Sequence, residues 1–227
     1  GSGYYSRLFD DFLIFAILAV ALNIVFGHTD QLFLFLGGLA GVSAYTTAIL
    51  ADMFGVSAWL TLIVGMLLAG LIGTLVSWVA AKQKFNVVLI SILTLNLQLA
   101  LSQTFVGLRD ITGGSTGRSF TGLGLTAVGD AVGVSAEMML YYVLLVALLL
   151  ALIFYVRLID SKYGLAFDTI RSDELAAASI GVDVVRYKTI NGFIGATMVG
   201  FAGVLFAQRQ GYVLPPTFSF QSVDVIV

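Results

Sequence analysis

Continuous apolar runs recur along this chain, and each is close to the length that a helix needs to cross a lipid bilayer. A transmembrane helix requires about 20 predominantly apolar residues. The predicted spans lie near 8–27, 32–51, 57–81, 86–106, 138–159 and 189–208, with the start of another at Phe218. Because the runs do not alternate and are too long for the strands of a membrane barrel, they predict helices. We therefore expect an all-α fold, a polytopic transmembrane helix bundle that forms a single domain over residues 1–227.

The composition excludes the soluble classes of protein. Hydrophobic residues make up 59% of the 227 residues and charged residues only 11%, whereas a soluble domain carries about 25% charged residues. A net charge of −2 provides no basic surface for nucleic acid. Cysteine is absent and His28 is the only histidine, so the sequence offers neither a thiolate metal site nor a histidine cluster. We expect no cofactor in this chain.

Basic residues gather in two of the predicted loops. They are Lys82 and Lys84 between the third and fourth spans, and Arg157, Lys162, Arg171, Arg186 and Lys188 around the loop 160–188. Two spans separate these loops, so both lie on one side, which the positive-inside rule assigns to the cytoplasm. Segment 107–137 is then predicted to be an external loop. The N-terminus is external as well if the turn at 28–31 reverses the chain.

Small residues recur at four-residue spacing inside several predicted spans. They form three stripes, which are Gly65, Ala69, Gly73 and Ser77; Gly37 and Gly41; and Gly192, Ala196 and Gly200. Small side chains allow helix backbones to approach closely in a membrane, where burial in lipid gives little drive for association. The stripes indicate either ordinary static packing or a bundle whose helices move against one another.

Polar side chains are unusually frequent in the fourth predicted span. They are Ser91, Thr94, Asn96, Gln98, Ser102 and Gln103, and all but Asn96 and Gln103 share one helix face through spacings of three, four and four residues. Polar groups in a span are costly unless they face protein or water. The face therefore indicates either the lining of a translocation pathway or hydrogen bonding between helices. No span interior contains a pair of charged residues, which argues against an ion- or proton-coupled carrier without excluding it.

The loop 160–188 contains the signals of a short helix between Ser172 and Gly181. Ser172 is a favourable N-cap, and two acidic residues follow it, where the helix dipole favours them. Alanines favour the helical interior, and Gly181 suits the C-terminal stop. Such a helix would present small side chains around Ala177. It is either a connector at the membrane surface or an element that fits a groove on a partner protein.

The run from Gly164 to Ala207 closely resembles the permeases of branched-chain amino acid ABC importers, specifically the M-type subunit. The residues that match the family pattern in register are Gly164, Ala166, Ile170, Arg171, Glu174, Ala176, Ala177, Ser179, Gly181, Arg186, Tyr187 and Lys188. Further similarities at 22–27, 41–46, 112–114 and 211–222 occur in the same order as in the family. The resemblance covers nearly the whole chain.

The resemblance implies an all-helical permease subunit in the plasma (inner) membrane of a prokaryote. Such importers pair two permease chains, here with a homologous H-type partner expected, with two cytoplasmic ATPases and an external substrate-binding protein. The implied substrates are branched-chain or related amino acids, or similar small organic solutes. ATP and Mg would bind to the ATPases, and this chain would not be an enzyme. The residues expected in the ATPase-coupling loop are Gly164, Arg171, Ser172, Asp173, Glu174, Ala176, Ala177, Gly181 and Arg186.

One departure from the family pattern follows the first glycine turn, where the family commonly has Gln-Leu-Ser-Leu-Gly-His. Here the stretch 30–36 keeps Gln31 and the leucines but lacks the Ser, Gly and His. In the family this stretch approaches the translocation path, so the resemblance implies that Gln31 joins the polar face of the fourth span there. The chain ends before the family's last spans, and we expect it to be truncated at its C-terminus. A secondary carrier or channel, and a membrane-embedded enzyme, remain as alternatives.

Overall fold

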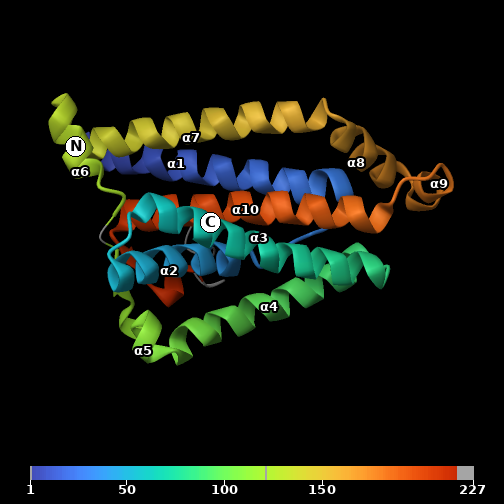
Figure 1. The fold of residues 1–227 in the computed structure, drawn as a ribbon, viewed down its shortest axis with the longest axis horizontal. Coiled ribbons are helices and arrows are strands. Elements are labelled where there is room, and N and C mark those ends of the chain that lie inside the picture. Colours follow the sequence, from blue (N-terminus) through green and yellow to red (C-terminus); the bar gives the residue numbers. More distant parts are fainter. Residues whose placement is uncertain (1, 121, 219–227) are drawn as a thin grey trace.

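The chain folds into long helices that lie side by side, in a computed structural model that describes residues 2–120 and 122–218 (Figure 1). The long helices are α1 (Ser2–Leu22), α2 (Leu36–Phe54), α3 (Ala58–Lys82), α4 (Val87–Gly107), α7 (Ala136–Ile159) and α10 (Val184–Gln210). Within the described residues, five helical stretches are long and apolar enough to cross a membrane, namely Tyr5–Gly27, α3, α4, α7 and α10. The prediction of an all-α, polytopic bundle is confirmed. The apolar run predicted beyond Phe218 lies outside the described residues.

Shorter elements connect the long helices. They are the π-helix η1 (Asn23–Gly27), α5 (Arg109–Thr112), the 3₁₀ turn η2 (Gly114–Thr116), α6 (Leu125–Val132), α8 (Lys162–Ser172), α9 (Glu174–Ser179) and the 3₁₀ turn η3 (Pro215–Phe218). Two short strands, β1 (Arg118–Ser119) and β2 (Tyr212–Val213), pair antiparallel, with Arg118 opposite Val213. This small sheet ties segment 107–137 to the end of α10.

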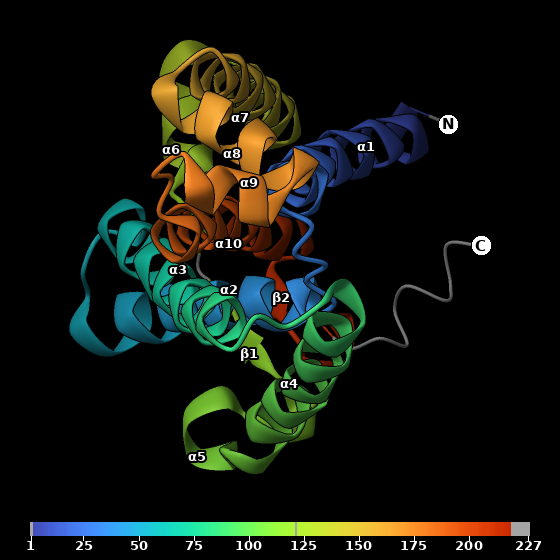
Figure 2. The ribbon, with the colours of Figure 1, turned by 90° about the vertical axis from the view of Figure 1, so that its right-hand side faces the viewer.

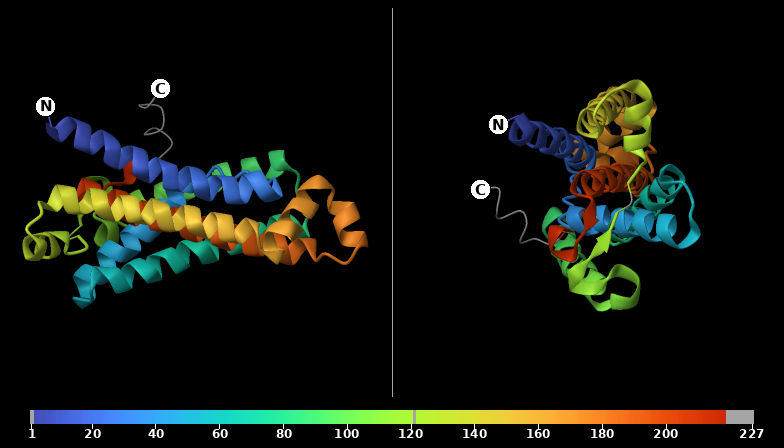
Figure 3. Two further views of the ribbon diagram at one scale, coloured as in Figure 1. Left: turned by 90° about the horizontal axis from the view of Figure 1, so that it is seen from above. Right: turned by 90° about the vertical axis from the view of Figure 1, so that its left-hand side faces the viewer.

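The connections gather at the two ends of the bundle. The N-terminus, α5 and α6 lie at one end, while α8, α9 and the turn between α3 and α4 lie at the other (Figures 1 and 3). This is the grouping that the basic residues predicted, since both basic loops share an end and segment 107–137 lies at the opposite end. The chain also reverses between α1 and α2, as that prediction required. Which end faces the cytoplasm stays a prediction.

The second predicted span, 32–51, was wrong in its first residues. The chain from 30 to 35 is non-helical, and the helix begins only at Leu36. The hydropathy of this stretch suits a helix, but the Thr94 side chain of α4 forms hydrogen bonds with the backbone of Leu32 and Leu34 instead. The sixth span also begins earlier than predicted: its helix, α10, starts at Val184 rather than near 189.

Helix α10 forms the centre of the bundle and packs against α1, α2 and α3 (Figure 2). The predicted small-residue stripes of α3 and α10 face each other there. A Cβ atom added to Gly200 would lie 2.9 Å from Cβ of Ala69, and one added to Gly192 would overlap the side chain of Ser77. Gly65 approaches α2, where an added Cβ would lie 2.6 Å from the carbonyl oxygen of Ser43. The small residues therefore allow the backbones of α3, α10 and α2 to approach closely, as is usual for helix contacts in a membrane.

Helices α4 and α7 lie at the periphery. Helix α4 contacts mainly α2 and η3, and it leaves an apolar face exposed that includes Leu89, Ile92 and Leu99. Helix α7 packs against α1 and exposes Leu149, Leu150 and other apolar residues. In a membrane protein these faces contact lipid or another helical chain.

Candidate functional site

A break in the helical backbone separates α1 from α2. Helix α1 widens into the π-helix η1, a rare geometry that is frequent at functional sites. The backbone from Asp30 to Phe35 is then non-helical up to the start of α2. Non-helical backbone within a membrane is tolerated only where protein or water satisfies its polar groups. The residues that do so here define the candidate site.

A buried polar network from α10 holds the first half of this break. Asn191 donates from Nδ2 to the carbonyl oxygen of Ile24 at 2.8 Å and to Oγ1 of Thr29 at 2.6 Å. Gln31 donates from Nε2 to the same Thr29 oxygen at 2.9 Å and to the carbonyl oxygen of Lys188 at 3.1 Å. Thr29, Gln31 and Asn191 are all buried. The carbonyl groups that the π-helix leaves free are thus bonded by side chains.

Two residues of α4 bond the second half of the break and the start of α2 that follows it. Leu34 donates its backbone N–H to Oγ1 of Thr94 at 3.0 Å. Gln98 accepts from the N–H of Gly38 at 2.6 Å and donates from Nε2 to the carbonyl oxygen of Phe218 at 2.6 Å. One amide side chain therefore joins the first turn of α2 to η3. Thr94 and Gln98 are buried, at 0% and 2% exposure, so each acts between protein elements.

The other predicted pathway residues lie differently. Ser91 donates to the carbonyl oxygen of Val87 in its own helix, and Ser102 accepts from Gln98 at 3.3 Å. Asn96 is exposed on the outer face of α4 and donates to the carbonyl oxygen of Ile92 within the helix. The structure thus brings Gln31, Thr94 and Gln98 to the break and leaves Asn96 facing outward.

The loop 160–188 folds into two helices rather than one. Helix α8 ends at Ser172, whose hydroxyl donates to the carbonyl oxygen of Asp168 at 2.9 Å. The N-cap of α9 is Asp173, which accepts from the N–H groups of Leu175 and Ala176 at 2.8 and 3.0 Å. The prediction that Ser172 caps this helix was therefore wrong. Ser172 and Asp173 are adjacent, and both residue types are favourable N-caps, but the carboxylate of Asp173 forms the cap.

The C-terminal stop of α9 is as predicted. Gly181 adopts φ +90°, a left-handed conformation that favours glycine, and the N–H of Val182 bonds to the carbonyl oxygen of Ala177 at 3.0 Å. Gly164 has a different role, because a Cβ there would overlap the backbone of Ile159 at the sharp turn between α7 and α8. Both glycines shape the loop.

The exposed surface of the loop differs from the prediction. Ala177, expected at the surface, is fully buried at 0% exposure, because it is the residue by which α9 packs back onto the chain. The exposed apolar side chains are Leu165, Leu175 and Ile180, at 71%, 79% and 74%. Ala176, Arg171 and Arg186 are exposed as well. The loop therefore exposes three large apolar side chains, of which Leu175 and Ile180 lie at α9 and Leu165 lies at the start of α8.

An ion pair that the sequence did not reveal ties α9 to α10. Lys188 donates from Nζ to Oε1 of Glu174, and the lysine side chain is only 5% exposed. The backbone carbonyl of the same lysine accepts from Gln31. Glu174, Lys188, Gln31 and Thr29 thus form continuous contacts from the tip of the loop to the break between α1 and α2.

A second connection centres on His28, which sequence reasoning had considered only as a metal ligand. Its Nδ1 lies 3.1 Å from Oδ1 of Asp168 in α8, and its Nε2 lies 3.2 Å from the hydroxyl of Tyr155 in α7. Asn23 of the π-helix donates to the same hydroxyl at 3.0 Å. The break is therefore joined to both α8 and α9. No sequence motif marked these pairs, since their members are more than 120 residues apart.

These features define a multi-pass helical membrane protein with a broken helix at its centre and a structured loop joined to that break. The family model for the branched-chain amino acid transport system permease component matches residues 4–227. The chain belongs to this family, and the resemblance inferred from the sequence is confirmed.

Two curated relatives carry the same printed name, high-affinity branched-chain amino acid transport system permease protein LivM. This chain is 30% identical to the one from Salmonella typhimurium and 31% identical to the one from Escherichia coli. Each match covers 92% of this chain and 53% of the relative, so the chain spans about half the length of these relatives. No solved structure matches the chain significantly.

Proposed function

We propose that this chain is a permease subunit of an ABC importer that moves branched-chain or related amino acids across the plasma membrane of a prokaryote. The family membership and the relatives' names support the class of substrate. ATP and Mg bind on separate cytoplasmic ATPase subunits, and this chain supplies the passage. The observation that carries the proposal is the loop of α8 and α9, whose apolar tip is joined through Glu174 and Lys188 to the break in the backbone.

The apolar tip of this loop is the proposed contact with an ATPase. Large exposed apolar side chains on a polar loop mark an interaction surface. Leu175 lies in α9, Ile180 is the C-cap residue of α9, and Leu165 lies in the first turn of α8. Because both helices are capped, these side chains are held in defined positions, so that movement of an ATPase can be transmitted to the loop.

Movement of the loop would reach the break through the residues described above. A shift of α9 pulls on Lys188 through its ion pair with Glu174, and Lys188 in turn holds Gln31. Gln31 lies in the non-helical segment, and Asn191 of α10 bonds Thr29 and the carbonyl oxygen of Ile24 directly before it. That segment therefore changes its position or its bonding when α10 moves. Substrate can shift this equilibrium only by binding the two arrangements differently.

The second permease chain is expected to pack near α4. A translocation pathway between two chains must be lined by side chains that are exposed in either chain alone. Asn96 meets this condition, since it lies among the exposed apolar residues Leu89, Ile92 and Leu99 of α4. An exposed amide in such a face is costly against lipid and suits a partner helix or a water-filled path. Thr94 and Gln98, on the buried side of α4, then hold this helix against the rest of the chain.

The external substrate-binding protein would contact the opposite end, at segment 107–137.

The proposal is tested by uptake of radiolabelled leucine into vesicles that contain this chain and its copurified subunits. We expect Leu175→Glu combined with Ile180→Glu to abolish ATP-dependent uptake and to lose the ATPases on purification. Met53→Glu is the matched control, because Met53 is similarly exposed, at 66%, at the other end of the bundle. Uptake that persists without ATPases would identify a secondary carrier instead.

A further inference from the structure

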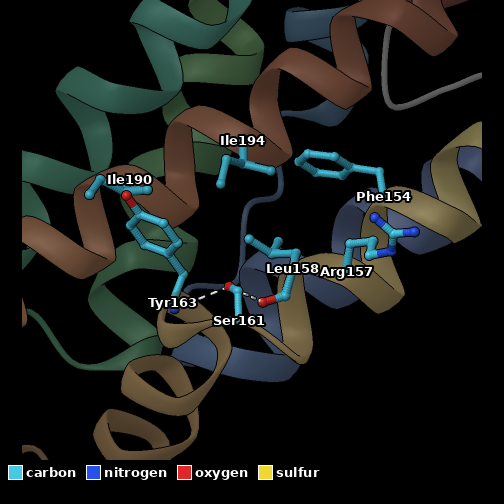
Figure 4. A pocket seen from close by; sticks show the side chains of 7 residues that line it. All are labelled: Phe154, Arg157, Leu158, Ser161, Tyr163, Ile190 and Ile194. Atoms are coloured by element: carbon cyan, nitrogen blue, oxygen red, sulfur yellow. Dashed lines mark hydrogen bonds between the residues drawn. The ribbon is translucent and has the colours of Figure 1, made fainter.

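A cavity opens between α7, the start of α8 and α10, at the end of the bundle that carries α9 (Figure 4). Its volume is about 400 Å³, which lies within the range of roughly 300–1,000 Å³ that is typical of ligand pockets. Its walls include Phe154 and Arg157 from α7, Ser161 and Tyr163 at the α7–α8 junction, and Ile190 and Ile194 from α10. None of the residues that line it takes part in the network at the break.

The walls of the cavity combine a long apolar surface with one cation. Phe154, Ile190 and Ile194 supply the apolar side, while Arg157 lies beside Phe154 on α7 (Figure 4). Among the described residues, Arg157 forms no ion pair and the Tyr163 hydroxyl forms no hydrogen bond, and no acidic residue lines the cavity. The Arg157 guanidinium and the Tyr163 hydroxyl are therefore free to bind a ligand, and the ligand that complements Arg157 is an anion.

The position of the cavity relative to the membrane indicates what kind of ligand carries this anionic group. Arg157 lies in the last turn of α7, where a spanning helix meets the headgroup region. Phe154 lies one turn deeper, and Ile194 lies within the spanning part of α10. A ligand that follows these walls has its anionic group at the interface and its apolar part in the hydrocarbon layer. That is the arrangement of a phospholipid, and basic pockets between spanning helices are known to bind anionic headgroups.

We propose that this cavity binds one anionic phospholipid, with its phosphate against Arg157 and one acyl chain against Phe154, Ile190 and Ile194. The site lies at the junction on which the loop is built. Ser161 lines the cavity, and its hydroxyl both donates to the carbonyl oxygen of Leu158 at 2.6 Å and accepts from the N–H of Tyr163 at 3.2 Å to cap α8. A bound lipid therefore packs against the residues that fix the angle between α7 and α8. The site is independent of the transported substrate.

The test is native mass spectrometry of the full protein in detergent, titrated with palmitoyl-oleoyl phosphatidylglycerol or with the zwitterionic phosphatidylcholine of the same chains. We expect one phosphatidylglycerol to be retained in preference to phosphatidylcholine. Arg157→Gln should weaken phosphatidylglycerol binding about fivefold, as expected for the loss of one cation near an anionic lipid. Phosphatidylcholine binding should weaken less, because its choline cation offsets the attraction between its phosphate and Arg157. Ile190→Phe, which fills the apolar part of the cavity, should weaken binding of both lipids.

Lys82→Gln is the matched control, because Lys82 is an exposed basic residue at the same end of the bundle but outside the cavity. If Lys82→Gln and Arg157→Gln weaken phosphatidylglycerol binding equally, or if the parent retains both lipids equally, the lipid is an unspecific surface layer and the proposal fails. Displacement of phosphatidylglycerol by inorganic phosphate alone would also overturn it, since the cavity would then be an anion site rather than a lipid site.

Discussion

Lys188 and Glu174 form an ion pair in which the lysine is almost fully buried and the carboxylate is half exposed, at 5% and 48% of their side-chain surfaces. The pair joins the short helix α9 to the central helix α10 across 14 residues of sequence. A buried cation is costly unless it is paired. Glu174 therefore holds α9 in place because Lys188 has no other described acidic partner.

Replacement of Glu174 by Gln should loosen α9. The expected cost is about 1–2 kcal/mol, less than the roughly 3–5 kcal/mol of a fully buried pair, because water screens the exposed carboxylate. Hydrogen exchange of the backbone amides of 174–182 should become faster in the variant. Asp110→Asn, which removes an exposed carboxylate at the other end of the bundle, is the control. Unchanged exchange in Glu174→Gln would mean that packing of Ala177 alone holds the helix.

Replacement of Gln98 by Leu should destabilise the chain more than the loss of an ordinary interhelical hydrogen bond. The change leaves the N–H of Gly38 and the carbonyl oxygen of Phe218 without their partner, and a buried unsatisfied group costs about 1–3 kcal/mol. Asn96→Leu is the matched control, since Asn96 is exposed and bonds only within its own helix. Thermal unfolding in detergent should separate the two variants. Equal melting temperatures would show that the break does not depend on Gln98.

Addition of a single methyl group at Gly73 should disturb the contact between α3 and α10. A Cβ there would overlap the side chain of Ala196 and lie 2.8 Å from the carbonyl oxygen of Gly192. Overpacking of this kind costs about 1–3 kcal/mol, so Gly73→Ala should lower the melting temperature. Gly107→Ala has no atom within 4 Å of the new methyl group and serves as the control. A stable Gly73→Ala variant would indicate that α3 and α10 can separate without cost.

The orientation can be measured with single cysteines, because the native chain has none. Ser172 and Ser119 are exposed at opposite ends of the bundle. An impermeant thiol reagent should label Ser119→Cys in intact cells and Ser172→Cys only after the membrane is opened. The expectation follows from the basic residues near 160–188. The reverse pattern of labelling would invert the proposed topology.

The sequence alone determined the properties that depend on local composition. Apolar runs long enough to cross a bilayer predicted the helices, and the clustering of lysine and arginine predicted which loops share an end of the bundle. Small residues at four-residue spacing marked the surfaces where α3 and α10 meet, and Gly181 marked the end of α9. Each of these patterns is formed by residues that are near one another in the sequence, so it can be interpreted without knowing which distant residues it contacts.

Tertiary structure alone decided which polar groups meet. The segment 30–35 is apolar enough for a helix, yet Thr94, 60 positions from Leu34 along the chain, bonds the Leu34 N–H in a non-helical path. Ala177 looked like surface but is buried, because the chain folds α9 back toward α10. Glu174 and Lys188, and His28 and Asp168, become partners only when separate helices pack. Hydrogen bonds and ion pairs require contact within a few ångströms, and the packing of helices distant in sequence creates that contact.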